Sequence, residues 1–103
     1  HNMKVLLVDD SKAMRHAEKD VLVQMGCTDI QEACDGLDAL SKVGAFEPDL
    51  LLVEWNMPNM DGLTFVKEYR AKGNSAPIIM VTTETEKDRV VEAIRRTAER
   101  VGA

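Results

Sequence analysis

Three short runs of consecutive apolar residues lie along the chain, at 5–8, 50–53 and 77–81. Each run is bounded by charged or turn-forming residues, which is typical of strands that are buried on both faces of a sheet. A more polar segment at about 29–34 contains Ile30, Ala33 and Cys34 and predicts a further strand. The hydrophobic pattern therefore predicts four strands.

The segments between these strands carry apolar residues at helical spacing. The first helix follows Ser11, whose hydroxyl can accept a hydrogen bond from a helix N–H, and ends at Gly26, which suits a left-handed terminal position. Its apolar positions are Met14, Ala17, Val21, Leu22 and Met25, and its polar positions include Lys12, Arg15, Glu18, Lys19 and Gln24.

The same spacing predicts three more helices. In the second, which follows the turn at 35–36, Leu37, Leu40 and Val43 are expected to face inward. The third spans about 62–72, with Leu63, Val66 and Tyr69 on one face. The fourth carries Val90, Val91, Ile94, Ala98 and Val101, and Thr83 and Glu86 before it have the spacing of a capping box.

Alternation of strands and helices predicts an α/β fold with a parallel sheet and helices on both faces. Three of the strands end in polar residues: Asp9-Asp10, Glu54 and Thr82-Thr83. Because parallel strands bring their carboxyl ends to one edge, where ligands bind in open α/β sheets, these residues are expected to form a site.

The chain has 103 residues and a formal net charge of −5. Its length predicts one domain over 3–103, with His1-Asn2 interpreted as an expression remnant. The negative charge argues against nucleic-acid binding, and no apolar run is long enough to cross a membrane. Without a signal peptide or a CxxC pair, Cys27 and Cys34 are expected to be reduced thiols in the cytoplasm.

Three carboxylates at one edge repel one another unless a cation lies among them. Asp9, Asp10 and Glu54 supply the oxygen ligands that Mg²⁺ prefers, and the hydroxyl of Thr82 could donate to an anionic oxygen held beside them. The alternative is that the three acids are solvated or partly protonated. No Ser-His-Asp or Cys-His pattern, P-loop or GxGxxG motif accompanies them, so the sequence does not predict an enzyme.

Three ordered segments, at 4–11, 54–62 and 77–84, resemble the receiver domain of two-component response regulators, and single-domain chemotaxis receivers in particular. The resemblance covers roughly residues 3–95. It implies a flavodoxin-like doubly wound parallel sheet with strand order 2-1-3-4. With the strands numbered along the chain, the acid at the end of strand 3 (residues 50–53) is the expected phosphorylation site. The resemblance implies that a histidine kinase phosphorylates this acid and that a downstream signalling protein responds.

The resemblance also assigns the site residues. It implies that Asp10, the acceptor carboxylate at position 54 and the backbone carbonyl of Asn56 hold Mg²⁺, with Asp9 in the outer shell. It implies that Thr82 is the switch hydroxyl, which meets the phosphoryl group and repositions the face around helix 4.

Two departures from the family pattern alter these expectations. The acceptor position carries Glu54 in place of aspartate, and the additional methylene displaces the carboxylate from the transfer geometry. We therefore expect weakened Mg²⁺ binding and no phosphorylation there, with Glu54 acting as a partial mimic of phosphoaspartate.

The second departure is the sequence after Ile94, which resembles the end of a fifth helix and lacks the family's fifth strand with its Lys-Pro motif. Either the chain is truncated or rearranged after helix 4, or an intervening segment is missing from the sequence. In the first case strand 4 is an apolar edge strand, which predicts a homodimer or domain-swapped assembly on the strand 4 and helix 4 side. Three interpretations remain open: a signalling module that works through protein contacts, a Mg²⁺-dependent phosphoacceptor, and a truncated or engineered scaffold that self-associates.

Overall fold

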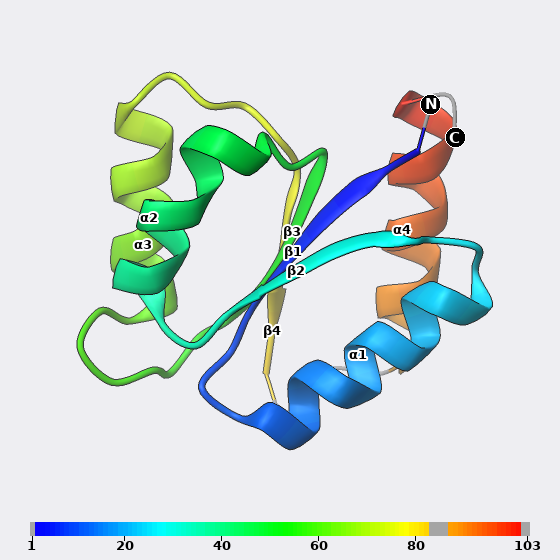
Figure 1. Cartoon of the computed structure of the whole chain (residues 1–103), viewed down its shortest axis with the longest axis horizontal. Coiled ribbons are helices and arrows are strands. Elements are labelled where there is room, and N and C mark those ends of the chain that lie inside the picture. Colours follow the sequence, from blue (N-terminus) through cyan, green and yellow to red (C-terminus); the bar gives the residue numbers. More distant parts are fainter. Residues whose placement is uncertain (1, 83–86, 102–103) are drawn as a thin grey trace.

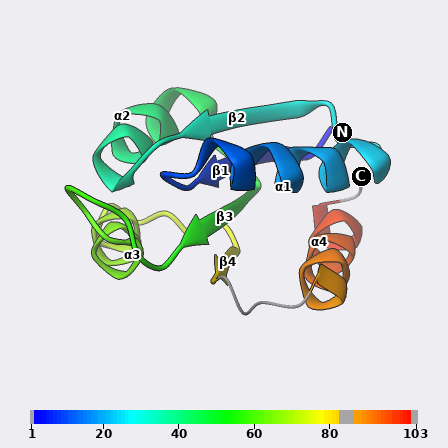
Figure 2. The same ribbon diagram turned by 90° about the horizontal axis from the view of Figure 1, so that it is seen from below.

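The computed structural model describes residues 2–82 and 87–101 and contains a parallel four-stranded sheet between two layers of helices (Figures 1 and 2). The elements follow one another as β1 (Lys4–Val8), α1 (Lys12–Gln24), β2 (Asp29–Ala33), α2 (Gly36–Phe46), β3 (Leu50–Glu54), α3 (Gly62–Ala71), β4 (Ile78–Val81) and α4 (Lys87–Val101). The predicted alternation of strands and helices is confirmed. The capping box expected at Thr83 and Glu86 lies outside the described residues.

The strand order is β2-β1-β3-β4, as the family resemblance implied. Val5 of β1 pairs with Ile30 of β2 and with Leu50 of β3, and Leu52 of β3 pairs with Ile79 of β4. The central strands β1 and β3 are apolar because both of their faces are covered by helices.

Two apolar clusters fill the spaces between the sheet and the helices. One lies between the sheet and helices α2 and α3, where Ala39, Val43, Phe46, Phe65 and Tyr69 are buried. The other lies on the opposite face, where Leu22 of α1 and Ile94 of α4 are buried against Val5, Leu7 and Leu52. Figure 2 shows the pairing of layers plainly, with α2 and α3 on one side of the sheet and α1 and α4 on the other.

One detail of the predicted helix faces was wrong: Leu37, which was expected to face inward, is 54 % exposed. Leu63 and Ala17, which belong to the predicted apolar positions of their helices, are exposed as well. Helices α1, α2 and α3 begin at the N-caps Ser11, Asp35 and Asp61, and packing against the sheet decides which stripe of each helix is buried. In α2 the buried stripe is Ala39, Val43 and Phe46, so Leu37 points to solvent.

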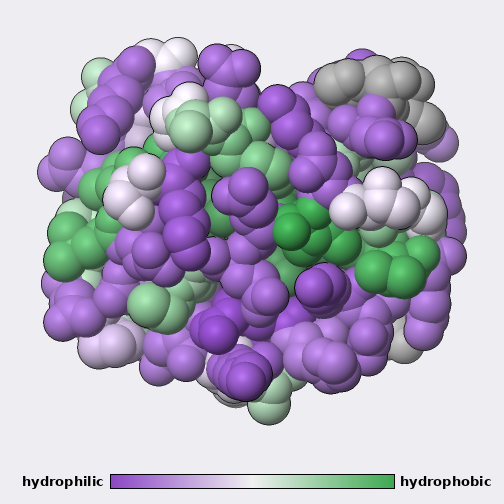
Figure 3. Space-filling model, viewed as in Figure 1, coloured by the Kyte–Doolittle hydropathy of each residue, from purple (hydrophilic) through white to green (hydrophobic). Residues whose placement is uncertain are grey.

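The surface visible in the orientation of Figure 1 is mainly hydrophilic, with hydrophobic residues in separate patches (Figure 3). The large exposed apolar side chains Val23, Leu37, Trp55 and Leu63 belong to different elements of the fold. Scattered apolar residues of this kind are ordinary on protein surfaces and do not by themselves mark a binding site.

Candidate functional site at the carboxyl edge of the sheet

Asp9 directly follows β1 and is held by three backbone contacts. Its N–H donates to the carbonyl of Ala33 at 3.1 Å, its carbonyl accepts from the Arg15 guanidinium, and its Oδ1 accepts from the N–H of Ser11 at 2.8 Å. The side chain is only 2 % exposed, and its second carboxylate oxygen, Oδ2, is buried without a hydrogen-bond partner among the described residues. Asp9 is therefore a fixed acid with one unsatisfied oxygen.

The electrostatic environment of Asp9 disfavours its charge. Burial raises the pKa of Asp9, and the nearby negative charges of Glu54 and Asp10 raise it further, against the opposing effects of the Ser11 N–H and of Arg15. A cation bound among these acids would reduce this penalty, and carboxylate oxygens are the donors that hard divalent ions prefer. The oxygen donors present thus fit Mg²⁺ chemically.

Glu54 ends β3 and is partly exposed. Its Oε1 accepts hydrogen bonds from the backbone N–H groups of Trp55 at 3.0 Å and of Asn56 at 3.3 Å. The longer glutamate side chain thus turns back onto the loop that follows it. The negative charge nevertheless remains close enough to raise the pKa of both Asp9 and Glu18.

The loop after Glu54 is fastened at both ends. The N–H of Gly62 donates to the carbonyl of Trp55 at 3.0 Å, which closes the loop at the start of α3. Asn59 adopts a left-handed conformation with φ of 68°, and its Nδ2 donates to Asp35 at 2.8 Å. Since Asp35 also caps α2, this contact ties the β3–α3 loop to the β2–α2 turn.

The remaining predicted site residues lie at the same edge. Asp10 and Asn56 are exposed and follow β1 and β3. Thr82 is partly buried and follows Val81, which is the register partner of Glu54. Thr83 lies outside the described residues. The described part of the chain contains no group of three or more His, Cys, Asp or Glu side chains placed to hold a metal ion.

The sequence analysis missed one acid near this edge, Glu18. It was placed among the polar positions of the first helix, yet it is only 8 % exposed, and its Oε1 is buried without a partner in the described residues. Burial, with the charges of Asp9 and Glu54, raises its pKa to about 8, while Arg15 opposes the shift. Its spacing of four residues from both Met14 and Leu22 was the signal that could have revealed an inward position.

No helix in the described residues is long and apolar enough to cross a membrane.

Comparison with known proteins identifies relatives of the whole chain. Over 94 residues the chain is 38% identical to chemotaxis protein CheY-3 of Vibrio cholerae, covering 89% of this chain and 72% of that protein. Over 96 residues it is 43% identical to chemotaxis protein CheY1 of Helicobacter pylori, covering 90% and 77%. The structure of Vibrio cholerae CheY4 superposes with a TM-score of 0.76 at 34% identity, covering all of this chain and 82% of the other.

The family model described as the response regulator receiver domain matches residues 5–101, which include every site residue named above. The sequence match and the strand order agree, and the chain belongs to the response regulator receiver domain family, whose members serve in two-component signalling.

Proposed function

We propose that this chain is a receiver module that acts through protein–protein contacts and does not accept a phosphoryl group at Glu54. The observation that carries the proposal is the pair of hydrogen bonds from Trp55 and Asn56 to the Glu54 carboxylate. A carboxylate engaged by its own loop is a poor nucleophile toward an incoming phosphorus, and catalysis of this kind depends on close positioning. In this proposal Glu54 supplies a constant negative charge at the end of β3.

We also propose that the chain binds Mg²⁺, with an affinity weakened by the glutamate at position 54. Asp10, Glu54 and the carbonyl of Asn56 would hold it, with Asp9 in the outer shell. When bound, the ion would neutralise the acidic edge. Thr82 serves as the switch hydroxyl beside it. The partners are a histidine kinase or a downstream signalling protein, by the family relationship, and the location is the cytoplasm.

The test of the phosphorylation proposal is intact-mass spectrometry after incubation with Mg²⁺ and acetyl phosphate or carbamoyl phosphate. We expect no added phosphoryl group on the wild-type chain. The matched variant Glu54→Asp shortens the side chain by one methylene and is expected to gain a single phosphoryl group that is lost on mild alkaline treatment. A stable phosphoryl group on Glu54 of the wild-type chain would overturn the proposal.

A second candidate function is a Mg²⁺-dependent phosphoacceptor that still takes phosphate from small donors. The buried, unsatisfied Oδ2 of Asp9 favours it, because a cation site would give that oxygen a partner. The same mass experiment separates the two candidates. A Mg²⁺-dependent mass increase on the wild-type chain that is absent after Glu54→Gln would establish the second.

We also propose that the chain self-associates on the side of β4 and α4, as a homodimer or a domain-swapped assembly. The described residues give β4 a single neighbour, β3, and the side chains of Ile78, Ile79 and Met80 remain partly exposed. Apolar edge strands of this kind pair with other chains. A concentration series by sedimentation velocity tests the proposal, and a folded monomer at all concentrations would refute it.

A further inference from the structure

The free side of β4 offers a regular set of backbone hydrogen-bonding groups. The carbonyls of Pro77 and Val81 accept from the N–H groups of Leu51 on β3 and of Trp55 directly after it. Because neighbouring residues of a strand direct their backbone groups to opposite sides, Ile78 and Met80 direct their N–H and C=O groups away from β3. In the described residues this outer side has no strand beside it.

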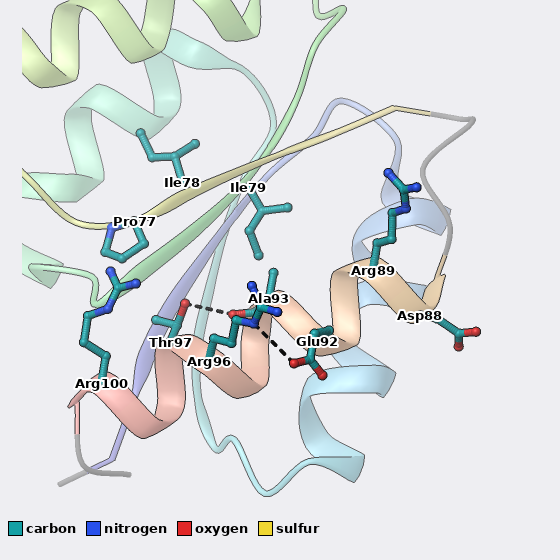
Figure 4. Close-up of a pocket in the computed structure, with 10 residues that line it drawn as sticks. All are labelled: Pro77, Ile78, Ile79, Asp88, Arg89, Glu92, Ala93, Arg96, Thr97 and Arg100. Carbon is teal, nitrogen blue, oxygen red and sulfur yellow. Dashed lines mark hydrogen bonds and ion pairs between the residues drawn. The ribbon is translucent and has the colours of Figure 1, made fainter.

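A groove of about 540 Å³ runs between this edge and α4 (Figure 4). Pro77, Ile78 and Ile79 form its strand side, and residues of α4 form the other. Figure 4 shows Ile79 directed toward the turn of α4 that carries Ala93, while Pro77 lies at the end of the groove near Arg100. Ile79 packs against the apolar cluster that contains Ile94. Since Figure 4 shows Ile79 directed toward Ala93, which precedes Ile94 near the middle of α4, the middle of β4 lies near the middle of α4.

Five charged residues of α4 line the groove, and all of them except Arg89 follow a symmetric pattern. Asp88, Glu92, Arg96 and Arg100 all line the groove and follow one another at intervals of four residues, which places them in one stripe along the helix. The two acids occupy the first half of the stripe and the two arginines the second half. Asp88 and Arg100 are equally far in sequence from Ile94, and so are Glu92 and Arg96.

Such a stripe is complementary to itself when two copies run antiparallel. A two-fold axis that passes beside Ile94 places Asp88 opposite the second copy's Arg100, and Glu92 opposite its Arg96. The same axis, passing between the two Ile79 residues, places Ile78 of one copy opposite Met80 of the other. In an antiparallel ladder that pair exchanges both of its backbone hydrogen bonds, so the outward groups of both strands would be satisfied.

We propose that the occupant of this groove is a second copy of the chain, joined by antiparallel pairing of β4 with β4 about a two-fold axis at Ile79. The two sheets become one continuous sheet of eight strands, with both α4 helices side by side on one face. The interface is isologous and closed, so association stops at the dimer. The inference rests on the self-association proposed above and is independent of whether Glu54 accepts phosphate.

Paired charge-reversal variants test this geometry directly. Asp88→Arg/Glu92→Arg gives a stripe of four arginines, and Arg96→Glu/Arg100→Glu gives a stripe of four acids. In a homodimer of either variant, two α4 stripes of the same charge would face each other across the axis. Each variant alone is therefore expected to dimerise about tenfold or more weakly than the wild-type chain. Mixed in equal amounts, the two variants face opposite charge at all four positions, and sedimentation velocity should show a heterodimer.

Charge reversals on the exposed part of α1, Lys19→Glu and Asp20→Lys, form the matched control. These are expected to leave the dimer unchanged, alone or mixed. Met80→Pro supplies an independent test, because it removes an outward N–H that is not used by the monomer and so should abolish the dimer while preserving the circular dichroism spectrum.

The inference is overturned by a wild-type chain that stays monomeric, by assemblies that grow beyond the dimer, or by weakened variants that do not recover on mixing. The phosphorylation proposal is tested separately, by the mass of the chain after treatment with acetyl phosphate, and that mass does not depend on whether the chain dimerises. Failure of the dimer geometry and failure of the phosphorylation proposal are therefore seen in different measurements.

Discussion

Gly62 packs directly against the backbone carbonyl of Glu54, so that a Cβ atom at position 62 would overlap with the oxygen of that carbonyl. Gly62 is also the first residue of α3, and its N–H donates to the carbonyl of Trp55. The start of α3 thus lies against the end of β3 because residue 62 has no side chain, and this contact fixes the loop that carries Asn56.

Gly62→Ala is therefore expected to destabilise the chain by about 2 kcal/mol, since a backbone carbonyl cannot move aside as a flexible side chain can. Gly44→Ala is the control, because Gly44 lies within α2 with open space around its Cβ position. There alanine should stabilise by about 0.5–1 kcal/mol through its helix propensity. Urea unfolding followed by circular dichroism measures both, and equal effects at the two positions would contradict the close approach.

Glu18 should make stability fall as pH rises. In the folded chain its pKa is raised to about 8, whereas the ordinary value for its carboxyl is 4.5. Between these values the unfolded chain releases a proton that the folded chain keeps. The free energy of unfolding should thus decline from about pH 4.5 to about pH 8 and then level off, with a total loss of up to about 4 kcal/mol.

Glu18→Gln is expected to flatten this pH dependence, and Glu18→Leu to flatten it and raise stability at pH 8, because leucine has no charge to lose water on burial. Glu68→Gln, at an exposed position of α3, is the control and should leave the slope unchanged. A wild-type stability that is constant between pH 5 and pH 8 would show that Glu18 is solvated.

Asp35 should contribute in the opposite direction. The N–H of Asp38 and the side-chain amide of Asn59 both donate to its carboxylate and lower its pKa. Its stabilising effect is therefore present above the pKa of an unfolded aspartate and is lost as pH falls through the lowered value. Asp35→Ala is expected to lower the urea midpoint at pH 7 and to reduce the loss of stability in acid, whereas Asp29→Ala, at an exposed position, should do neither.

Trp55, the single tryptophan, offers a probe of Mg²⁺ binding because it follows Glu54 and is 44 % exposed. Titration with Mg²⁺ is expected to change its fluorescence with weak affinity, and Asp10→Asn should remove the response. Asp20→Asn, at an exposed position of α1, serves as the control. A response that survives Asp10→Asn would place the ion elsewhere.

The sequence alone determined the alternation of strands and helices and which polar residues meet at the carboxyl edge of the sheet. A strand of consecutive apolar residues, such as Leu50 to Val53, has apolar side chains on both faces and is therefore buried on both. Parallel strands bring Asp9, Glu54 and Thr82 to the same edge of the sheet. These conclusions depend only on the spacing of apolar residues and on the order of the elements, both of which can be read from the sequence.

Only the tertiary structure decided the position of Glu18, the hydrogen bonds that turn Glu54 back onto its loop, and the placement of α4 beside α1. The physical reason is that helical spacing leaves the rotation of each helix undetermined by about one residue, and the packing against the sheet selects it. The match between the midpoints of β4 and α4 likewise depends on how two elements are set against each other in space. In the proposed dimer, this match allows the acidic half of α4 in one copy to face the basic half of α4 in the other.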